Sequence, residues 1–548
     1  MRLRTGCAVA AVATIVVGLG PPASPAAAGE AGIRPVRDCA RLVGDFALPT
    51  GAAHVTAATP TPGQADAPEH CDVRGYVEPA VRFHLRLPTS TYAGRYLQYG
   101  CGGFCGDLGV PAFPDCGGRP PGDFAVAATD DGHVGRPPFP FGDGGWAAGD
   151  RAARDDWQFR APHVVSQAAK RVIAAYYGSP PRRSYFSGCS NGGREALLLA
   201  QRYPDDFDGI VAEAPAAAIT PLIVHQAWLA RSNTAADGQP ILTGAKLPAL
   251  HAAVVAACDG LDGLTDGQVD EPGACRFDPA TLACPAGTDT PACLTAAQVE
   301  VVRRVYAGAT DPAGRRLYPG GQPYGSEPAW YGWLIPAPEL GGLSAAAALA
   351  DNYLRYMGYP IGEPHSSLAD FAFTVAEFDR LTPEGVRANA LSLDLSRFRR
   401  AGGKLVIWHG GSDQAIPPAG TLDYYQRLWQ RDGGPHRTQR YARLFMVPTL
   451  YHCADGYRLT EFDPLPELVR WVERGDAPDR VVARGRDAQG QVVRSRPVFP
   501  YPLRARYDGS GSVDDAGNFV PAAPPGPPRD VIRWVGEDLY DRPGPVVP

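Results

Sequence analysis

The sequence is poor in lysine, has no excess of positive charge and, beyond its first residues, contains no apolar run long enough to span a membrane. Lysine occurs only at Lys170, Lys246 and Lys404, and arginine supplies the other basic side chains. The formal net charge is −6, which excludes the basic footprint of a nucleic-acid-binding protein. Glycine and proline together make up about 22% of the chain, below the roughly 25–30% of low-complexity sequences. Hydrophobic residues make up 45%, which excludes global disorder and suffices for a sizeable core.

The first 28 residues have the pattern of a secretory signal peptide. Arg2 and Arg4 precede an apolar run from Cys7 to Leu19, and a tract of small residues ends at Ala28. This run is too short to span a bilayer, so we expect cleavage near Ala28 and a secreted protein without a membrane anchor. Loss of Cys7 leaves 11 of the 12 cysteines in a compartment where disulfides form. Because 11 is odd, at least one thiol stays outside any intrachain pair.

Strand and helix patterns alternate over two stretches of the chain, which is typical of a parallel α/β sheet. The expected strands lie at 81–87, 96–99, 124–128, 184–187, 209–212, 404–408 and 444–447, and the expected helices at 163–177, 195–201 and 465–473. Residues 29–75 have an irregular pattern. We therefore predict one α/β domain made of residues 29–215 and 397–548, with residues 216–396 inserted as a lid.

A short motif, Gly188-Cys189-Ser190-Asn191-Gly192, lies between an expected strand and an expected helix. This is the context of the Gly-x-Ser-x-Gly nucleophile elbow of α/β-hydrolases, in which the serine occupies a sharp strand-to-helix turn. The sequence therefore predicts that Ser190 is a nucleophile. The alternative is an ordinary glycine- and serine-containing turn, because the motif alone is common.

The partners of such a serine should follow in the order acid and then base. Asp413 comes just after the strand 404–408, and His452 comes just after the strand 444–447. Open α/β sheets carry their sites at these strand ends, so we expect Asp413 to orient His452 and His452 to accept the proton of Ser190. Taken singly, Asp413 fits a turn and His452 fits a surface loop. His409 is a lesser candidate, better explained as a strand-end residue.

An oxyanion hole needs two backbone N–H groups, one of which follows the nucleophile. Asn191 would supply the first, and Gly102 or Gly103, in the loop after the strand 96–99, would supply the second. Glycine suits this place because it lets the backbone approach a substrate closely. Three cysteines crowd the same loop, and with two earlier ones they leave the pairing open among Cys39, Cys71, Cys101, Cys105 and Cys116.

Two further cysteines adjoin the predicted nucleophile and base. Cys189 directly precedes Ser190, and Cys453 directly follows His452. If Ser190 and His452 meet, these cysteines also lie close together, so a Cys189–Cys453 disulfide would limit the distance between nucleophile and base. The alternative is a pair of independent buried thiols, which export disfavours.

These features together resemble the tannase and feruloyl esterase family, whose members join a Cys-Ser and a His-Cys dipeptide through such a disulfide. The resemblance extends over residues 201–212 and covers most of the chain. It implies an α/β-hydrolase core, a lid that carries calcium, and hydrolysis of aromatic carboxylic esters such as galloyl and hydroxycinnamoyl esters. A polyester-degrading branch of the family acts on a terephthalate monoester.

The expected lid contains a candidate calcium loop. Asp259, Asp262 and Asp266 offer three carboxylates among glycines, and hard oxygen ligands suit Ca²⁺. The resemblance implies that the carbonyl groups of Leu264 and Gln268 complete the site. A solvated acidic turn is the alternative. We expect the metal to be structural, and two disulfides to brace the lid, Cys258 with Cys275 around the loop and Cys284 with Cys293 beyond it.

The leading hypothesis is a secreted serine esterase that acts on small-molecule or plant-polymer esters of aromatic acids. Lid aromatics such as Trp330, Trp333, Tyr353 and Tyr356 are candidates to pack the acyl ring, although core packing is the commoner fate of any one of them. One alternative is a peptidase or aliphatic esterase on the same scaffold. Another is a non-catalytic, calcium-stabilised extracellular binding protein.

Overall fold

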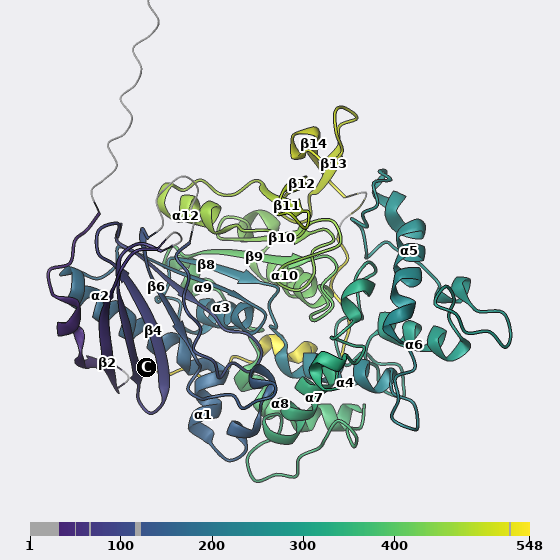
Figure 1. Cartoon of the computed structure of the whole chain (residues 1–548), viewed down its shortest axis with the longest axis horizontal. Coiled ribbons are helices and arrows are strands. Elements are labelled where there is room, and N and C mark those ends of the chain that lie inside the picture. Colours follow the sequence, from purple (N-terminus) through teal and green to yellow (C-terminus); the bar gives the residue numbers. More distant parts are fainter. Residues whose placement is uncertain are drawn as a thin grey trace, which may run out of the picture.

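The computed structural model describes residues 32–49, 51–64, 67–114, 122–524, 526 and 528–547. The expected signal peptide and Cys116 lie outside these residues. A ten-stranded sheet runs through the centre of the molecule in the order β1-β2-β3-β4-β6-β5-β7-β8-β9-β10 (Figure 1). Its strands are β1 (Gly44–Leu48), β2 (Gly51–Thr61), β3 (His70–Val77), β4 (Val81–Pro88), β5 (Arg95–Tyr99), β6 (Phe124–Thr129), β7 (Arg183–Cys189), β8 (Gly209–Glu213), β9 (Lys404–Gly410) and β10 (Ala442–Val447).

The sheet has a parallel and an antiparallel half. Strands β5 to β10 pair in parallel, and their carboxyl ends therefore meet at one edge of the sheet. Strands β1 to β4 form an antiparallel meander that joins this half through β6. The prediction of an α/β-hydrolase fold is confirmed. Because these strands are parallel and joined by helices, the loops after β7, β9 and β10 lie at the same edge of the sheet.

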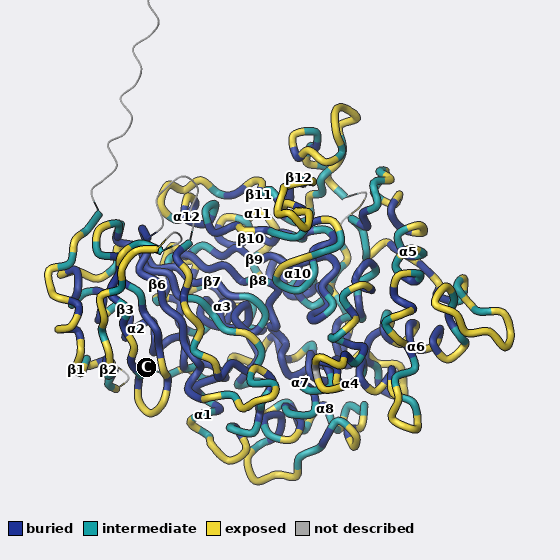
Figure 2. The backbone as a smooth tube through the Cα atoms, viewed as in Figure 1, coloured by how far each residue is buried: buried dark blue, intermediate teal, exposed yellow. Residues whose placement is uncertain are grey.

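The prediction that residues 29–75 are irregular is wrong, because β1, β2 and β3 lie there. Their sequence lacks the apolar pattern of a buried strand, because β2 consists largely of alanine and threonine and many residues of β1 and β2 are exposed (Figure 2). Backbone pairing with the next strand, more than burial of one face, holds these strands in the sheet.

Helices cover both faces of the parallel half. The residues of β9 show the division, because Leu405 and Ile407 pack in one core and Val406 and Trp408 pack in the other. The first core contains α2 (Ala161–Tyr177), α3 (Asn191–Arg202) and α10 (Ala419–Asp432), and the second contains α12 (Leu465–Arg474). Successive side chains of a strand point to opposite faces, which accounts for the alternation.

The chain between β8 and β9 contributes helices rather than strands of the main sheet. These helices are α4 (Ile219–Ser232), α5 (Leu247–Cys258), α6 (Ala296–Ala307), α7 (Ala345–Tyr356), α8 (Val375–Ala388) and α9 (Ser396–Arg400). Helices α5 and α6 share a separate apolar core and lie beyond the end of the sheet (Figure 1). Helices α4, α7 and α8 pack into the first core of the sheet, so half of the expected lid is continuous with the main body.

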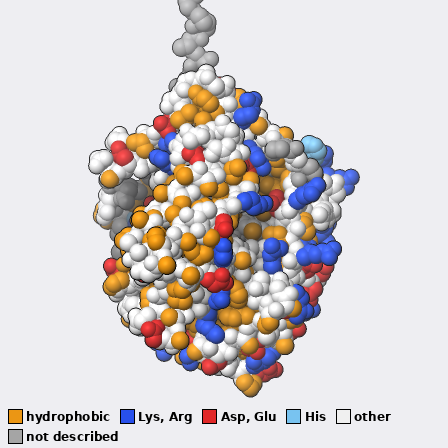
Figure 3. All heavy atoms as spheres, turned by 90° about the vertical axis from the view of Figure 1, so that its right-hand side faces the viewer, with side chains coloured by type: hydrophobic (Ala, Val, Ile, Leu, Met, Phe, Trp, Pro, Cys, Tyr) orange, Lys and Arg blue, Asp and Glu red, His pale blue; other side chains and the backbone are white. Residues whose placement is uncertain are grey.

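The chain after β10 adds two small hairpins, β11 (Val481–Arg486) with β12 (Val492–Val498) and β13 (Arg504–Tyr507) with β14 (Phe519–Ala522). The short helices α1 (Arg151–Asp155) and α11 (Pro435–Thr438) complete the set. Figure 3 views the molecule from the side of α5 and α6, where hydrophobic side chains are spread among charged ones. Among the described residues, no helix is long and apolar enough to cross a membrane.

Candidate active site

Ser190 occupies a strained turn between β7 and α3. Its backbone has φ 63° and ψ −116°, a conformation that non-glycine residues rarely adopt. Two glycines make the turn possible: a Cβ on Gly188 would lie 2.7 Å from the backbone of Gly192, and one on Gly193 would lie 2.4 Å from the carbonyl oxygen of Glu213. The turn therefore has the form of a nucleophile elbow, with the serine at the N-terminus of α3.

His452 and Asp413 are in direct contact. Nδ1 of His452 lies 2.8 Å from Oδ2 of Asp413, although 39 residues separate them in sequence. The backbone N–H of His452 donates to the side chain of Gln414 at 3.2 Å, which fixes the loop from a second point. Because Nδ1 faces the carboxylate, Nε2 is the nitrogen that remains to exchange a proton.

Asp413 is held as an anion. Its Oδ1 accepts the N–H groups of Ala415 at 2.7 Å and Ile416 at 2.8 Å, and its Oδ2 also lies 3.2 Å from Nε2 of His409. Complete burial alone would raise the pKa of Asp413, but His452 and His409 outweigh it and lower the pKa well below its usual range. His409 is itself buried in β9 and bonded to Thr421, so it supports the carboxylate from behind.

A disulfide joins the residues next to Ser190 and His452. Cys189 and Cys453 are bonded with their Cα atoms 5.9 Å apart, across 264 residues of sequence. A ring nitrogen of His452 lies within 4.8 Å of both sulfur atoms. Among the described residues Ser190 Oγ makes no hydrogen bond. Catalytic hydrogen bonds are often long in a free enzyme and tighten when substrate binds.

The loop of residues 100–106, here called the oxyanion loop, lies against the start of α3. A Cβ on Gly100 would lie 2.6 Å from Cα of Gly192, so the two backbones touch. Of the two expected donors, Gly102 is exposed with open space around its Cα, whereas a Cβ on Gly103 would lie 2.3 Å from the carbonyl oxygen of Phe141. The N–H of Asn191 is among the first of α3, where helical amides have no acceptor within the helix.

The four aromatic residues singled out from the expected lid differ in burial and in their distance from the candidate triad. Trp330 is buried and donates to Ser326, and Tyr353 is buried and bonded to Thr220, so both belong to the core. Tyr356 is half-buried. Trp333 alone of the four adjoins the candidate triad, with its ring centroid 6.1 Å from that of His452.

Sequence reasoning missed two groups of residues at this site. Gln226 of α4 accepts the indole N–H of Trp333 and donates to the carbonyl of Ala415, so it ties the segment around Trp333 to the Asp413 loop. Glu195 and Asp131 form a buried carboxyl pair behind the oxyanion loop. No motif marks these residues, and only their burial, which a sequence does not reveal, distinguishes them from surface side chains.

The candidate calcium loop is ordered by hydrogen bonds and ion pairs. Asp259 accepts the backbone N–H groups of Asp266, Gly267 and Gln268 at 2.9–3.2 Å. Asp262 accepts the N–H of Leu264 and pairs with no cation among the described residues.

Arginines from β12 also reach this loop. Arg494 and Arg496 bond to the carboxylate of Asp266 at 3.1 and 2.5 Å. The oxygen donors suit a hard cation. However, the three carboxylates of the loop are not among the groups of described residues whose ligand atoms gather within 4.8 Å of one another.

Four more disulfides stabilise the described chain. Cys258–Cys275 and Cys284–Cys293 link the cysteines that the sequence suggested as partners in the lid. Cys39–Cys71 and Cys101–Cys105 resolve four of the five cysteines whose pairing the sequence left open. The second of these closes the oxyanion loop.

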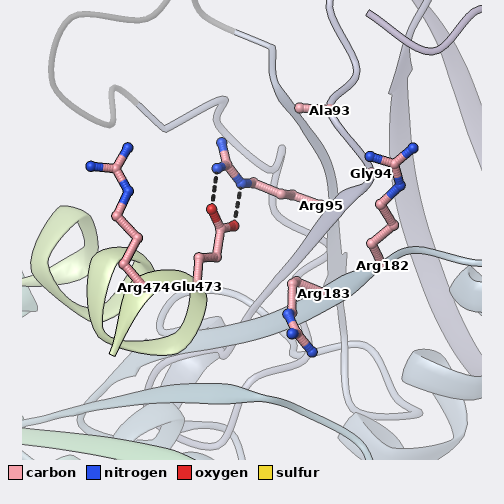
Figure 4. A pocket seen from close by; sticks show the side chains of 7 residues that line it. All are labelled: Ala93, Gly94, Arg95, Arg182, Arg183, Glu473 and Arg474. Carbon is pink, nitrogen blue, oxygen red and sulfur yellow. Dashed lines mark hydrogen bonds and ion pairs between the residues drawn. The ribbon is translucent and has the colours of Figure 1, made fainter. Parts of the chain in front are cut away.

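A cavity of about 490 Å³ lies away from the candidate triad. Figure 4 shows its centre, where Arg95 pairs with Glu473, and the guanidinium groups of Arg182, Arg183 and Arg474 around it. Arg183 begins β7, whereas Ser190 follows the end of the same seven-residue strand, so about 20 Å of extended chain separates them. The cavity is therefore distinct from the site at the carboxyl edge of the sheet.

Comparisons with known proteins place the chain in a family. The family described as tannase and feruloyl esterase matches residues 66–522. A mono(2-hydroxyethyl) terephthalate hydrolase of Piscinibacter sakaiensis is 35% identical, covering 88% of this chain and 90% of its own. A probable feruloyl esterase of Arthroderma benhamiae is 33% identical over 67% of this chain and 68% of its own.

Solved structures show the same fold. Feruloyl esterase B from Aspergillus oryzae aligns with a TM-score of 0.74 at 25% identity, covering 87% of this chain and 98% of that one. A tannin acyl hydrolase from Aspergillus niger aligns with a TM-score of 0.64 at 20% identity, covering 90% and 94%. On the extent of the family match and the identity of these relatives, the chain belongs to the tannase and feruloyl esterase family of carboxylic ester hydrolases.

Proposed function

We propose that this protein is a secreted serine esterase that hydrolyses esters of aromatic carboxylic acids through an acyl-enzyme intermediate. The observation that carries the proposal is the constellation of Ser190, His452 and Asp413. Asp413 lies 2.8 Å from His452, and a disulfide joins the residues next to His452 and Ser190. Such an arrangement performs acyl transfer on several unrelated folds.

The proposed mechanism follows from the positions of these atoms. Ser190 Oγ attacks the ester carbonyl while Nε2 of His452 takes its proton, and the resulting imidazolium is stabilised by the anionic Asp413. Backbone N–H groups of Asn191 and of Gly102 or Gly103 stabilise the oxyanion. His452 then protonates the leaving alcohol. Water next attacks the acyl-enzyme while His452 takes a proton from it, and His452 returns a proton to Ser190 as the carboxylic acid leaves.

The preference for an aromatic acid is supported by Trp333 and by the relatives. The indole of Trp333 lies beside His452 and is held there by Gln226, so an acyl group on Ser190 would meet an apolar ring. The relatives named above are described as hydrolases of a terephthalate ester and as feruloyl esterases. We therefore propose hydroxycinnamoyl, galloyl or terephthaloyl esters as the substrate class.

The test compares wild type with Ser190→Ala on methyl ferulate, methyl gallate, mono(2-hydroxyethyl) terephthalate and p-nitrophenyl acetate. We expect wild type to turn over at least one aromatic ester with a higher kcat/KM than the acetate, and Ser190→Ala to be inactive. Equal rates for the two proteins on every ester would refute the esterase mechanism. Turnover of the acetate alone would refute the aromatic preference.

Secretion and a structural calcium ion complete the proposal. Five disulfides among the described residues suit an oxidising compartment. Asp259, Asp262 and Asp266 would hold Ca²⁺ with the carbonyl groups of Leu264 and Gln268, which requires Asp266 to share its charge between the ion and the arginines of β12. The ion would stabilise the lid and take no part in the reaction.

A further inference from the structure

The side chain of Glu195 is buried between α3 and the oxyanion loop, with 1% of its surface exposed. One carboxyl oxygen lies 2.6 Å from Nδ2 of Asn191, and the other lies 3.4 Å from the backbone nitrogen of Cys101. A Cβ on Gly100 would lie 2.8 Å from this second oxygen, so only glycine lets the carboxyl group approach the loop backbone. One side chain thus touches both segments.

These two segments are the two sides of the proposed oxyanion hole. Asn191 carries the amide that follows the nucleophile, and Cys101 immediately precedes Gly102 and Gly103. The Cys101–Cys105 disulfide closes the loop into a small ring, whose sulfur atoms lie 3.5 and 3.9 Å from Glu195 Oε1. Both sulfur atoms of this ring therefore contact the carboxyl group of Glu195.

The side chain of Asn191 is fixed from both ends. Nε of Arg194 donates to its Oδ1 at 2.7 Å, while its Nδ2 donates to Glu195. Arg194 is fully buried and donates to the backbone carbonyls of Trp157 and Gln158. Arg194 is therefore rigidly placed and gives the side chain of Asn191 one orientation. The hydrogen bond from Asn191 to Glu195 holds the other end of that side chain.

Asp131 is a second buried carboxyl group beside Glu195. Both carboxyl groups are buried, and their oxygens lie within 4.8 Å of each other. Burial raises the pKa of Glu195 to about 7 against the opposing charge of Arg194, and burial and Glu195 raise the pKa of Asp131 well above its usual value. Oδ1 of Asp131 makes no hydrogen bond among the described residues, which suits a carboxyl group that keeps its proton.

We propose that Glu195 is a positioning residue that holds the Asn191 amide and the oxyanion loop at the separation the transition state requires. The inference rests on the proposed function, because it presumes an oxyanion at Ser190. Donors to an oxyanion act only when the negative charge develops, so their displacement lowers kcat more than it changes KM. A merely structural role of Glu195 would instead reduce the amount of folded enzyme and leave both constants unchanged.

The test is Glu195→Gln, whose amide can accept from Asn191 or from Cys101 but not from both. We expect kcat to fall by roughly tenfold to a hundredfold, with KM within about twofold of wild type, on whichever ester wild type hydrolyses. The matched control is Asp423→Asn on α10, a fully buried carboxyl group that accepts hydrogen bonds from Arg427, Ile532 and Tyr540 and none from the proposed oxyanion hole. This control should lower the melting temperature and leave kcat per folded enzyme unchanged.

A double-mutant cycle separates positioning from general damage. If Glu195 acts through the side chain of Asn191, then Asn191→Ala combined with Glu195→Gln should lose little more than the worse single variant. Glu195→Asp, which withdraws the carboxyl group by one methylene, replaces Glu195→Gln if the latter does not fold, with the same kcat loss expected. An unchanged kcat in a folded Glu195 variant, or an equal loss in Asp423→Asn, would overturn the inference. The proposed function itself fails only if wild type is no faster than Ser190→Ala.

Discussion

Removal of the Cys189–Cys453 disulfide should affect both stability and catalysis. We choose Cys189→Ala with Cys453→Ala, which places no second hydroxyl group beside Ser190. A disulfide restricts the unfolded chain, and the restriction grows with the logarithm of the closed loop. With a sequence separation of 264, the chain-entropy relation gives about 5.5 kcal/mol for the free energy of unfolding.

The Cys284–Cys293 disulfide provides a matched control. Its sequence separation is 9, for which the same relation gives about 2.5 kcal/mol. The control lies in the chain between β8 and β9, remote in sequence from the candidate triad. The two double variants should therefore differ by about 3 kcal/mol in the free energy of unfolding.

Catalysis should separate the two variants more sharply. Loss of the Cys189–Cys453 link frees the distance between Ser190 and His452, and a displacement of about 1 Å in an active site can lower the rate about a hundredfold. We expect kcat of the Cys189/Cys453 variant to fall at least tenfold at a temperature where it is folded, and kcat of the Cys284/Cys293 variant to stay near wild type.

The measurements are urea denaturation followed by circular dichroism and initial rates on the best aromatic ester. Equal stability losses in the two variants would refute the loop-length argument. A folded Cys189/Cys453 variant with the kcat of wild type would refute the role of the disulfide in holding nucleophile and base together.

Four further predictions address other parts of the site. Asp413→Asn should lower kcat by about 10⁴-fold with little change in KM, because the imidazole loses its orienting anion; pre-steady-state and steady-state rates on one ester measure this, and a loss below tenfold would count against the triad. Asp262→Ala, or a chelator added to wild type, should lower the melting temperature if calcium stabilises the lid, and a melting curve that neither treatment moves would argue against the ion. Burial raises the folded-state pKa of Glu195 to about 7, so the stability that its neutral form contributes is fully present below its unfolded pKa, near 4.5, and is lost as pH rises through 7. The melting temperature of wild type should therefore fall relative to that of Glu195→Gln as pH rises across this window. Melting temperatures of the two proteins that change in parallel with pH would contradict the raised pKa. Trp333→Ala should raise KM for aromatic esters more than for p-nitrophenyl acetate, and an equal change for both would remove Trp333 from the acyl pocket.

The parallel half of the sheet could be predicted from sequence because its strands are buried on both faces. Runs such as residues 404–408 are almost continuously apolar, and this pattern can be recognised without knowing which segments pack against the strand. The strands β1 and β2 could not be predicted, since many of their residues are exposed and β2 consists largely of alanine and threonine. Their place is set by backbone pairing with each other and with β3.

The candidate triad illustrates the same division between local and distant information. Ser190 lies in a motif whose glycines are needed within four residues of it, so the local sequence reveals it. Asp413 and His452 follow from their order and their positions after strands. Glu195 lies in the same helix as the motif yet escaped notice, because its importance comes from contact with a loop 94 residues earlier. The pairing of Cys39 with Cys71 likewise depends on three-dimensional proximity, which cysteine counting does not give.

The order of the cysteines along the chain has a consequence for how the protein must be made. Four of the five disulfides of the described residues join cysteines that are neighbours in the sequence, whereas the Cys189–Cys453 link passes over four others. A chain that emerges N-terminus first presents Cys116 as the nearest available partner of Cys189, long before Cys453 appears. Oxidation in order of emergence would therefore leave Cys453 alone and the triad unassembled. Production of active enzyme should depend on a host that can reshuffle disulfides, and not only form them.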